Sequence, residues 1–387
     1  MRQDGELRVN VLMICTEKLP VPNIRGGAIQ TYIVGVAGLL NKHHNLTILG
    51  RTDPELPNDE VVNGVRYVRV PSDGLLEVYA EGVLDFVSRF GGNYDLIHIF
   101  NRPKLVLPVR KAAPSARIVL SMHNDMFNSA KIHPSEGAAV VEVTERIITI
   151  SNYIGNEIAA LFPNARAKVK TVYSGVDLNR FSPWSESESS HRDRETIRSE
   201  YGLGSKKVIL FVGRLSRNKG PHVLVKAMSQ LSHKDAALVV VGGAWYSDNS
   251  ISDYIAYVRA LAEKSPIPVI TTGYVEAHDV HRWFNAGDVF VCTSLWQEPL
   301  ARVHYEAMAA GLPFLTTARG GNPEIAADPF GKLIQNPEDP AEYAQKLNVL
   351  LSDLQSARRH GLQGRRFVEK GFTWDRVARD ILTVWQP

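Results

Sequence analysis

Short apolar runs recur along this chain, and several of them lead through a glycine-containing turn into residues with helical spacing. Val9–Cys15 is the first such run, and it is followed by Gly26, Gly27 and then Ala28–Asn41, where apolar residues recur every three or four positions. A continuous apolar run is typical of a strand that is buried on both faces of a parallel sheet. The alternation therefore predicts an α/β fold with doubly wound parallel sheets.

The chain has 387 residues. This length predicts two domains, because one hydrophobic core rarely extends beyond about 250–300 residues. The composition changes after Phe181, where residues 182–202 read SPWSESESSHRDRETIRSEYG and are rich in serine and in charges of both signs. This composition predicts partly loop and partly a short solvated helix, and the stretch is the best candidate for the connection between the domains. We therefore expect Rossmann-like domains at 1–181 and 207–371, a linker at 182–206 and a terminal helix at 372–387.

The charge and the cysteine content narrow the class of protein. There are 44 basic and 41 acidic residues, a net charge of +3, and no run of five or more like charges, so nucleic acid is not favoured as a partner. The first eight residues include several charged ones and no apolar run is as long as a bilayer span, so we expect a cytoplasmic protein without signal peptide or membrane helix. Cys15 and Cys292 lie in apolar runs of different halves, which predicts two buried, reduced thiols.

Two features of the first half fall at the predicted carboxyl edge of its sheet. The Gly26–Gly27 pair follows the first strand, and the apolar run Arg117–Met122 ends at His123, Asn124 and Asp125. A glycine pair alone is more often a flexible turn, and a lone histidine at a strand end is usually structural. Ligands of open α/β sheets gather at this edge, however. The shared position therefore makes the glycine pair and His123 candidates for a binding site.

In the second half, Arg214 and Lys219 lie on either side of a short loop that follows the strand-like run Val208–Val212. Two cations in one loop at a strand end favour an anion between them, although an exposed charged turn is the alternative. Glycine-containing turns follow several predicted strands of this half and predict a ligand cleft lined by backbone. They lie at Gly213, Gly242–Gly243, Gly273 and Gly320–Gly321.

The stretch from Ser294 to Thr317, SLWQEPLARVHYEAMAAGLPFLTT, predicts a strand end, an acidic turn, a helix and a new strand. Pro299 suits the first turn of a helix, and Gly311 followed by Pro313 would end that helix. Free backbone amides at a helix start are a good site for a phosphate or pyrophosphate. The amides expected there are those of Leu300, Ala301 and Arg302.

Two carboxylates lie in this stretch, Glu298 and Glu306. An eight-residue step would leave their side chains about 80° apart on a helix. They are therefore unlike a paired acid and base that act on one atom. Two separate acceptors for sugar hydroxyls, on either side of a diphosphate, are the interpretation we favour.

Three motifs together resemble the retaining glycosyltransferases of family GT4: GRLSRNKG at 213–220, QEPLARVHYEAMAAGLPF at 297–314 and GGNPE at 320–324. The resemblance covers nearly the whole chain, and two glutamates separated by seven residues before an Ala-Met-Ala-x-Gly-x-Pro run are its most specific part. ICTEKLPVPNIRGGAIQTYI at 14–33 and HND at 123–125 also resemble the subgroup of spore coat proteins of the SA type.

The resemblance implies the GT-B fold, in which two Rossmann-like domains face a central cleft, the first on the acceptor side and the second on the donor side, with the last helix crossing back to the first. It implies transfer of a hexose or N-acetylhexosamine from a nucleoside diphosphate sugar to a hydroxyl or glycan acceptor, with UDP-sugar expected before GDP-sugar. No metal and no other cofactor is expected. Spore coat or cell-surface glycan synthesis would be the setting, and association with a membrane surface or a spore coat stays open.

The resemblance also implies roles for individual residues. Glu298 would bind hydroxyls of the transferred sugar, His123 would sit beside that sugar near the reacting centre, and Glu306 would accept from the ribose. The backbone of Tyr274 and Val275 would meet the base. The diphosphate would be approached by the Gly26–Gly27 loop and held by Arg214, Lys219 and the amides of Leu300, Ala301 and Arg302.

The sequence departs from many relatives at two places. Leu300 and Ala301 stand where many have Phe-Gly, and Phe100 stands where many have a second histidine. Two other functions remain open: a catalytically silent coat or structural protein with the same fold, and a nucleotide-sugar epimerase. Because Arg214, Lys219, Glu298 and Glu306 are all present, the transferase is the hypothesis that we favour.

Overall fold

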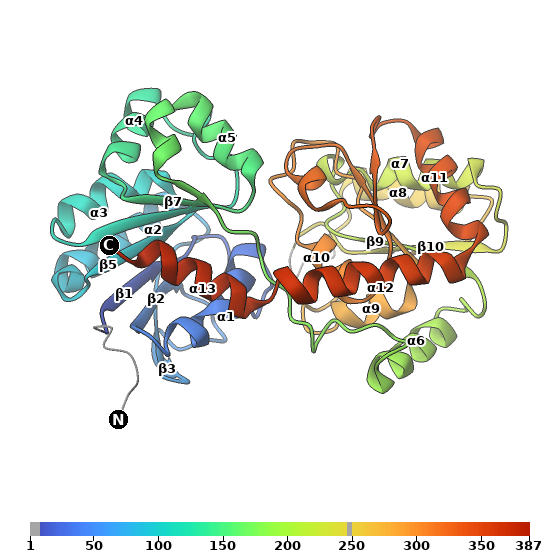
Figure 1. Cartoon of the computed structure of the whole chain (residues 1–387), viewed down its shortest axis with the longest axis horizontal. Coiled ribbons are helices and arrows are strands. Elements are labelled where there is room, and N and C mark those ends of the chain that lie inside the picture. The colour runs from blue at the N-terminus through green and yellow to red at the C-terminus, as the bar shows by residue number, and fades with distance from the viewer. Residues whose placement is uncertain (1–7, 246–249) are drawn as a thin grey trace. The chain divides into compact units, whose positions relative to one another are not determined.

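The computed structural model describes residues 8–245 and 250–387, which form two compact units (Figure 1). Unit 1 comprises Met1–Gly175 together with Trp374–Pro387, and unit 2 comprises Val176–Thr373. Among the described residues, no helix has both the length and the apolar character that crossing a membrane requires. Most of the charged start, on which the expectation about a signal peptide rests, lies outside the described residues.

The described part of unit 1 contains an eight-stranded sheet with the order β3-β4-β2-β1-β5-β6-β7-β8. Neighbouring strands are parallel except β3 and β4, which form an antiparallel hairpin at one edge. The central strands β1 and β5 are almost fully buried, as expected for strands covered on both faces. The strands are β1 (Asn10–Ile14), β2 (Asn45–Arg51), β3 (Asp59–Val62), β4 (Val65–Val70), β5 (Leu96–Phe100), β6 (Arg117–Met122), β7 (Arg146–Thr149) and β8 (Val169–Thr171).

Helices connect these strands, and the C-terminal helix joins them. The helices are α1 (Ala28–Leu40), α2 (Leu76–Phe90), α3 (Val106–Ala112), α4 (Pro134–Val143), α5 (Asn152–Leu161) and α13 (Trp374–Trp385), with short 3₁₀ turns at Gly91–Asn93, Pro103–Leu105 and Pro163–Ala167. Helix α13 packs on α1, where the Trp374 ring meets the Tyr32 ring edge-on at 6.0 Å. Arg117 Nη1 on β6 donates to the Trp385 carbonyl at 2.7 Å, so the end of the chain is held in unit 1.

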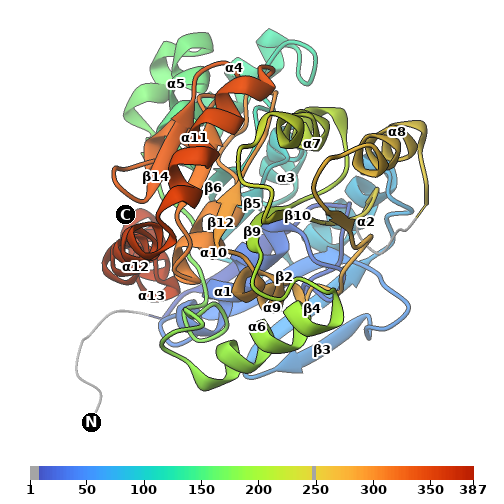
Figure 2. The same cartoon turned by 90° about the vertical axis from the view of Figure 1, so that its right-hand side faces the viewer.

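In unit 2, the described residues contain a six-stranded sheet with the order β11-β10-β9-β12-β13-β14. All paired neighbours are parallel. The strands are β9 (Lys207–Val212), β10 (Ala236–Val241), β11 (Val269–Thr271), β12 (Val289–Val291), β13 (Phe314–Thr317) and β14 (Gly331–Ile334). Helices α7, α8 and α11 cover one face, and α9, α10 and α12 cover the other (Figure 2). Both units are therefore doubly wound, as predicted.

The helices of unit 2 vary widely in length. They are α6 (Glu188–Glu200), α7 (Pro221–Ala227), α8 (Asp253–Glu263), α9 (Val280–Ala286), α10 (Val303–Ala309), α11 (Pro340–Ser352) and α12 (Leu354–Gly371), with 3₁₀ turns η4 (Arg217–Lys219), η5 (Met228–Gln230) and η6 (Asn322–Ile325). The two cysteines are free and buried, Cys15 after β1 and Cys292 after β12, as predicted.

The stretch that was expected to link the domains, partly as loop and partly as a short solvated helix, contains helix α6, which packs on α9 within unit 2. Glu188, Arg192 and Glu195 are exposed, whereas two arginines of the helix are buried. Arg194 Nη2 donates to Asp288 Oδ1 at 2.7 Å, and Arg198 Nη1 lies 3.4 Å from Asp288 Oδ2, with all three side chains buried. The Trp184 ring covers the Arg194 guanidinium at 4.6 Å. The predicted helix is therefore only partly solvated, because two of its arginines bind it to the core of unit 2.

The close approach of α12 to the end of α10 generates the first prediction. A Cβ atom at Gly361 would lie 2.0 Å from the Gly311 carbonyl oxygen, whereas one at Gly371, on the same helix, would meet nothing within 4 Å. We expect Gly361→Ala to lower the free energy of unfolding by about 1–3 kcal/mol through overpacking. Gly371→Ala should change it by less than about 1 kcal/mol. Urea denaturation measures both, and equal effects of the two substitutions would contradict the packing described.

Candidate active site

The strands of unit 2 end at one edge of the sheet, and the predicted donor-site residues lie in the turns at that edge. Arg214 lies just beyond β9, and Lys219 ends the 3₁₀ turn η4 in the same loop. The turn after β10 is joined to the turn after β11 by a hydrogen bond of 3.0 Å from Gly242 N to Gly273 O. Ligands of parallel α/β sheets bind at such an edge. The structure thus brings together segments that are far apart in the sequence.

Glu298 is the most constrained polar residue at this edge. Its side chain is only 8% exposed, and its Oε2 atom accepts from Lys219 Nζ at 2.6 Å, Ser294 Oγ at 2.7 Å and Trp296 Nε1 at 2.8 Å. Burial raises the pKa of Glu298, but the Lys219 ammonium and the hydrogen bonds lower it more, so the pKa lies below its ordinary value. Glu298 is therefore an ionised carboxylate at neutral pH.

The second carboxylate oxygen of Glu298 differs from the first. Within residues 8–245 and 250–387, Oε1 has no hydrogen-bond partner, because all three donors converge on Oε2. One oxygen thus fixes the side chain, and the other remains able to accept from a hydroxyl group of a ligand.

Backbone contacts hold the two loops that carry Lys219 and Glu298. Thr293 Oγ1 donates to the Lys219 carbonyl at 2.6 Å, and the Gly321 amide donates to the Glu298 carbonyl at 2.8 Å. Gly320 has a φ of 56°, and a Cβ atom there would lie 2.0 Å from the Glu298 carbonyl oxygen. Gly320 and Gly321 were predicted to line a ligand cleft. In the structure they pack against the backbone of Glu298.

Arg214 has a different environment from Lys219. Its guanidinium lies over the Trp245 ring at 4.3 Å. In the part of the chain that the structure describes, it forms no hydrogen bond and no ion pair with a carboxylate. The aromatic face leaves the N–H groups of the guanidinium in its plane able to bind an anion.

The helix expected to begin at Pro299 begins later. Helix α10 starts at Val303 and has only seven residues, so the prediction that Pro299 occupies its first turn is wrong. The amide of Ala301 is not free, because it donates to Asn322 Oδ1 at 3.3 Å. A proline suits many turns besides a helix start. Asn322, which accepts from the Ala301 amide, lies in η6, 21 residues further along the sequence. The Leu300 and Ala301 side chains are buried.

Glu306, Tyr274 and Val275 complete the predicted donor site. Glu306 lies on α10 and is mostly buried. Its Oε1 atom accepts from Arg302 Nη2 at 3.3 Å, so Arg302 takes part through its side chain as well as its backbone. Tyr274 and Val275 are half-buried and follow Gly273 at the end of β11, and Tyr274 Oη donates to Glu276 Oε2 at 3.3 Å.

In unit 1, the other two candidates also follow strands at the carboxyl edge. Gly26 and Gly27 end the loop between β1 and α1, and both have positive φ angles, 85° and 100°. His123 follows β6. Its ring meets the Tyr32 ring edge-on at 4.9 Å, and its amide donates to Asn101 Oδ1 at 3.0 Å. The predicted positions at this edge are therefore correct for both.

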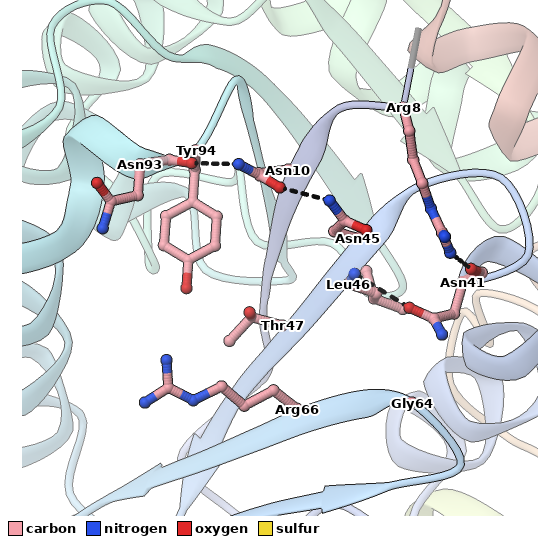
Figure 3. A pocket seen from close by; sticks show the side chains of 10 residues that line it. All are labelled: Arg8, Asn10, Asn41, Asn45, Leu46, Thr47, Gly64, Arg66, Asn93 and Tyr94. Carbon is pink, nitrogen blue, oxygen red and sulfur yellow. Dashed lines mark hydrogen bonds between the residues drawn. The ribbon is translucent and has the colours of Figure 1, made fainter. Parts of the chain in front are cut away.

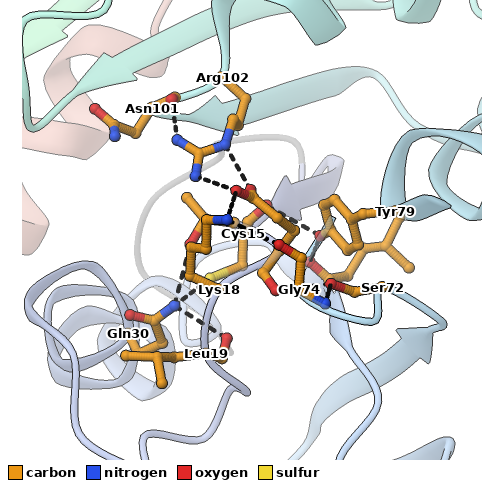
Figure 4. Close-up of polar contacts among 12 residues, drawn as sticks. Cys15, Lys18, Leu19, Gln30, Ser72, Gly74, Tyr79, Asn101 and Arg102 are labelled. Atoms are coloured by element: carbon orange, nitrogen blue, oxygen red, sulfur yellow. Dashed lines mark hydrogen bonds and ion pairs between the residues drawn. The ribbon is translucent and has the colours of Figure 1, made fainter. Parts of the chain in front are cut away.

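A buried ion pair at the same edge was missed by the sequence analysis (Figure 4). Arg102 donates through Nε to Glu17 Oε2 at 2.5 Å and through Nη2 to Glu17 Oε1 at 2.7 Å, and both residues are under 10% exposed. Burial raises the pKa of Glu17, and Arg102 lowers it to below its ordinary value. Arg102 Nη1 also donates to the Asn101 carbonyl at 2.7 Å. This network therefore supports the residue that holds the His123 amide.

The signal that could have found this network is a strand that ends in polar residues. Asn101 and Arg102 directly follow the apolar run of β5, as the HND tripeptide follows β6. Asn101 has a φ of 55°, which is uncommon outside glycine, and its Oδ1 also accepts from the Asn124 amide at 2.9 Å. Polar residues at the ends of neighbouring parallel strands are brought together by the sheet itself.

A pocket of unit 1 lies at the opposite, amino edge of the sheet (Figure 3). Asn10 and Asn45, which begin β1 and β2, line it and share a hydrogen bond of 2.9 Å. None of the predicted site residues lines this pocket. Its position at the amino ends of the strands separates it from the candidate site.

No group of three or more His, Cys, Asp or Glu side chains that could hold a metal ion is found among the residues described. The candidate site of unit 2 includes the charged side chains of Arg214, Lys219, Glu298, Arg302 and Glu306. This arrangement can bind an anion through its cations and accept hydrogen bonds from hydroxyl groups through its carboxylates.

Comparison with known proteins identifies the family. The model described as Glycosyltransferase Family 4 matches residues 26–180, and the model described as Glycosyl transferases group 1 matches residues 193–367. The chain is 45% identical over 382 residues to Spore coat protein SA of Bacillus subtilis strain 168, which covers 98% of this chain and 99% of that protein. The chain belongs to glycosyltransferase family 4. This family 4 chain is also 41% identical over 382 residues to Putative glycosyltransferase YtcC of the same strain, with 98% and 92% covered.

Solved structures agree on the fold of this family 4 chain. Sucrose-phosphate synthase from Thermosynechococcus elongatus matches with a TM-score of 0.79 and 22% identity, covering 98% of each chain. Anabaena Alr3699/HepE in complex with UDP and glucose matches with a TM-score of 0.77 and 19% identity, covering 97% of this chain and 99% of that one. These proteins have the GT-B fold. The predicted GT-B fold with two doubly wound domains, and the resemblance to the SA-type subgroup, are confirmed.

The contact between Gly320 and Glu298 generates a second prediction. Gly204 has a similar φ of 47°, but a Cβ atom there would meet nothing within 4 Å. Alanine at either position costs about 1–2 kcal/mol of backbone strain. Gly320→Ala should lower the free energy of unfolding by about 1–3 kcal/mol more than Gly204→Ala, because it also displaces the Glu298 backbone. Thermal and urea unfolding of the two variants test this, and a smaller effect at Gly320 would contradict it.

Proposed function

We propose that this family 4 glycosyltransferase transfers a hexose or N-acetylhexosamine from a nucleoside diphosphate sugar to a hydroxyl acceptor, with retention at the anomeric carbon. The observation that carries this proposal is the buried Glu298 carboxylate beside Lys219, with one oxygen fixed and the other able to accept from a sugar hydroxyl. A cation and a hydroxyl acceptor, side by side, match the diphosphate and the sugar of such a donor.

The leaving group gains negative charge as the bond to the sugar breaks. Lys219 donates one of its three N–H bonds to Glu298, and the other two are able to bind a phosphate oxygen. Arg214 supplies a second cation from the same loop. Fixed charges of this kind stabilise a departing nucleoside diphosphate without a metal ion, so we propose metal-independent catalysis.

The remaining donor contacts are proposed from the sequence motifs that this chain shares with family 4. Glu306 is proposed to accept from the ribose hydroxyls, and the backbone at Tyr274 and Val275 to contact the base. The Gly26–Gly27 loop and His123 of unit 1 are proposed to meet the diphosphate and the transferred sugar. The Ala301 amide is excluded from the diphosphate contacts while it donates to Asn322.

We propose a UDP-sugar as donor before a GDP-sugar. A structure of Anabaena Alr3699/HepE contains UDP-glucose, whereas a Mycolicibacterium smegmatis relative, 26% identical over 376 residues, is named a GDP-mannose-dependent mannosyltransferase. Both nucleotides therefore belong in any binding experiment. The expected acceptor is a glycan or a small hydroxyl compound, and the expected compartment is the cytoplasm.

A catalytically silent coat protein is the second candidate, and one observation favours it: the relative at 45% identity is named Spore coat protein SA. The two functions differ in one measurable respect, since a transferase without acceptor hydrolyses its donor slowly and a silent protein does not.

Proton NMR of the first released sugar also tests retention, because a retaining enzyme releases the anomer that the donor carries.

The third prediction concerns donor binding. Lys219→Ala and Glu306→Ala should each weaken binding of UDP-glucose or GDP-mannose by about tenfold or more, because each removes a charged hydrogen-bonding group. Isothermal titration calorimetry measures the dissociation constants, and donor hydrolysis should fall in parallel. Lys264→Ala and Glu338→Ala, which change exposed residues of unit 2, are the matched controls.

Two results would count against the proposed function. One is unchanged nucleotide affinity in both site variants while the controls behave like the wild type. The other is a wild-type chain that binds none of the nucleotide sugars in a broad panel.

A further inference from the structure

Lys219, the cation proposed to bind the donor diphosphate, already contacts an anion of this chain. Its Nζ atom lies 2.6 Å from Glu298 Oε2, and the two side chains are 20% and 8% exposed. Charges that are this close and largely removed from water interact strongly. An incoming phosphate must therefore share Lys219 with the resident carboxylate.

Glu298 is unable to avoid this competition by turning away. Ser294 and Trp296 hold the same Oε2 atom at 2.7 and 2.8 Å, and the Gly321 amide holds the Glu298 carbonyl at 2.8 Å. A carboxylate that accepts from three donors, on a backbone that is itself held, has little freedom to change its rotamer. Its charge is consequently a fixed feature of the site.

The substrate and the product of the proposed reaction meet this fixed charge differently. The sugar of the donor offers hydroxyl groups to Oε1, which has no hydrogen-bond partner among the described residues. The nucleoside diphosphate has no such hydroxyls, and its terminal phosphate carries about one more negative charge, since the last ionisation has a pKa near 6. The carboxylate thus attracts the donor and repels the product.

We propose that Glu298 determines specificity for the donor over the product, by competing with the terminal phosphate for Lys219 while accepting from the sugar. This inference rests on the proposed function and deepens it. It assigns to one ion pair both donor recognition and release of the nucleoside diphosphate.

The test is a comparison of affinities for UDP and UDP-glucose, and for GDP and GDP-mannose, by titration calorimetry. In Glu298→Gln the side chain keeps its shape and loses its charge. The free nucleoside diphosphate should bind roughly tenfold more tightly than to the wild type, because a charged competitor for Lys219 is removed. The nucleotide sugar should bind no more tightly than before. Glu338→Gln, which removes an exposed carboxylate of unit 2, should change neither affinity.

A second variant should shift the affinity for the nucleoside diphosphate in the opposite direction, and it tests the inference if Glu298→Gln does not fold. Ser294→Ala removes one donor from Oε2, so the carboxylate should bind Lys219 more strongly, and the nucleoside diphosphate should bind a few-fold more weakly. Unchanged or weakened UDP binding in Glu298→Gln, or tightened UDP binding in Ser294→Ala, overturns the inference alone. A wild-type chain that binds none of the four nucleotides overturns the proposed function, and the inference with it.

Discussion

The candidate donor site depends on one buried ion pair, Lys219 with Glu298. A carboxylate this deeply buried is costly unless it is paired and hydrogen-bonded, and here Lys219, Ser294 and Trp296 all donate to a single oxygen. The residues around the pair are arranged to keep it in place. Thr293 holds the backbone of Lys219, and Gly321 holds that of Glu298. Removing either charge would leave the other without its partner, so stability and binding are linked at this point of the fold.

The parallel sheet explains how residues so far apart in the sequence reach one site. Arg214 and Lys219 follow β9, Glu298 follows β12, and Gly320 follows β13, and these three strands are neighbours with a common direction. The sheet of unit 1 does the same for Glu17 after β1, Arg102 after β5 and His123 after β6. The candidate functional residues named here therefore lie shortly after the carboxyl ends of the strands. Membership of glycosyltransferase family 4 agrees with that arrangement.

Much of this was predictable from the sequence, because the strands are continuous apolar runs and local patterns of this kind survive in the folded chain. Arg117–Met122 was predicted and found as β6. The failures share a cause, which is a contact distant in sequence. The Ala301 amide, predicted to be free, donates to Asn322, 21 residues away, and the burial of Arg194 depends on Asp288, 94 residues away. The pairing of Glu17 with Arg102 spans 85 residues and likewise has no local signature.

The central claim is that Lys219 and Glu298 together form the point where the diphosphate meets the sugar. A crystal structure of this chain with an unhydrolysed nucleoside diphosphate sugar tests it most directly. The account predicts that a phosphate oxygen lies within hydrogen-bonding distance of Lys219 Nζ, and that a hydroxyl of the transferred sugar donates to Glu298 Oε1. A donor bound with its diphosphate away from Lys219, or with its sugar out of reach of Glu298, would contradict it.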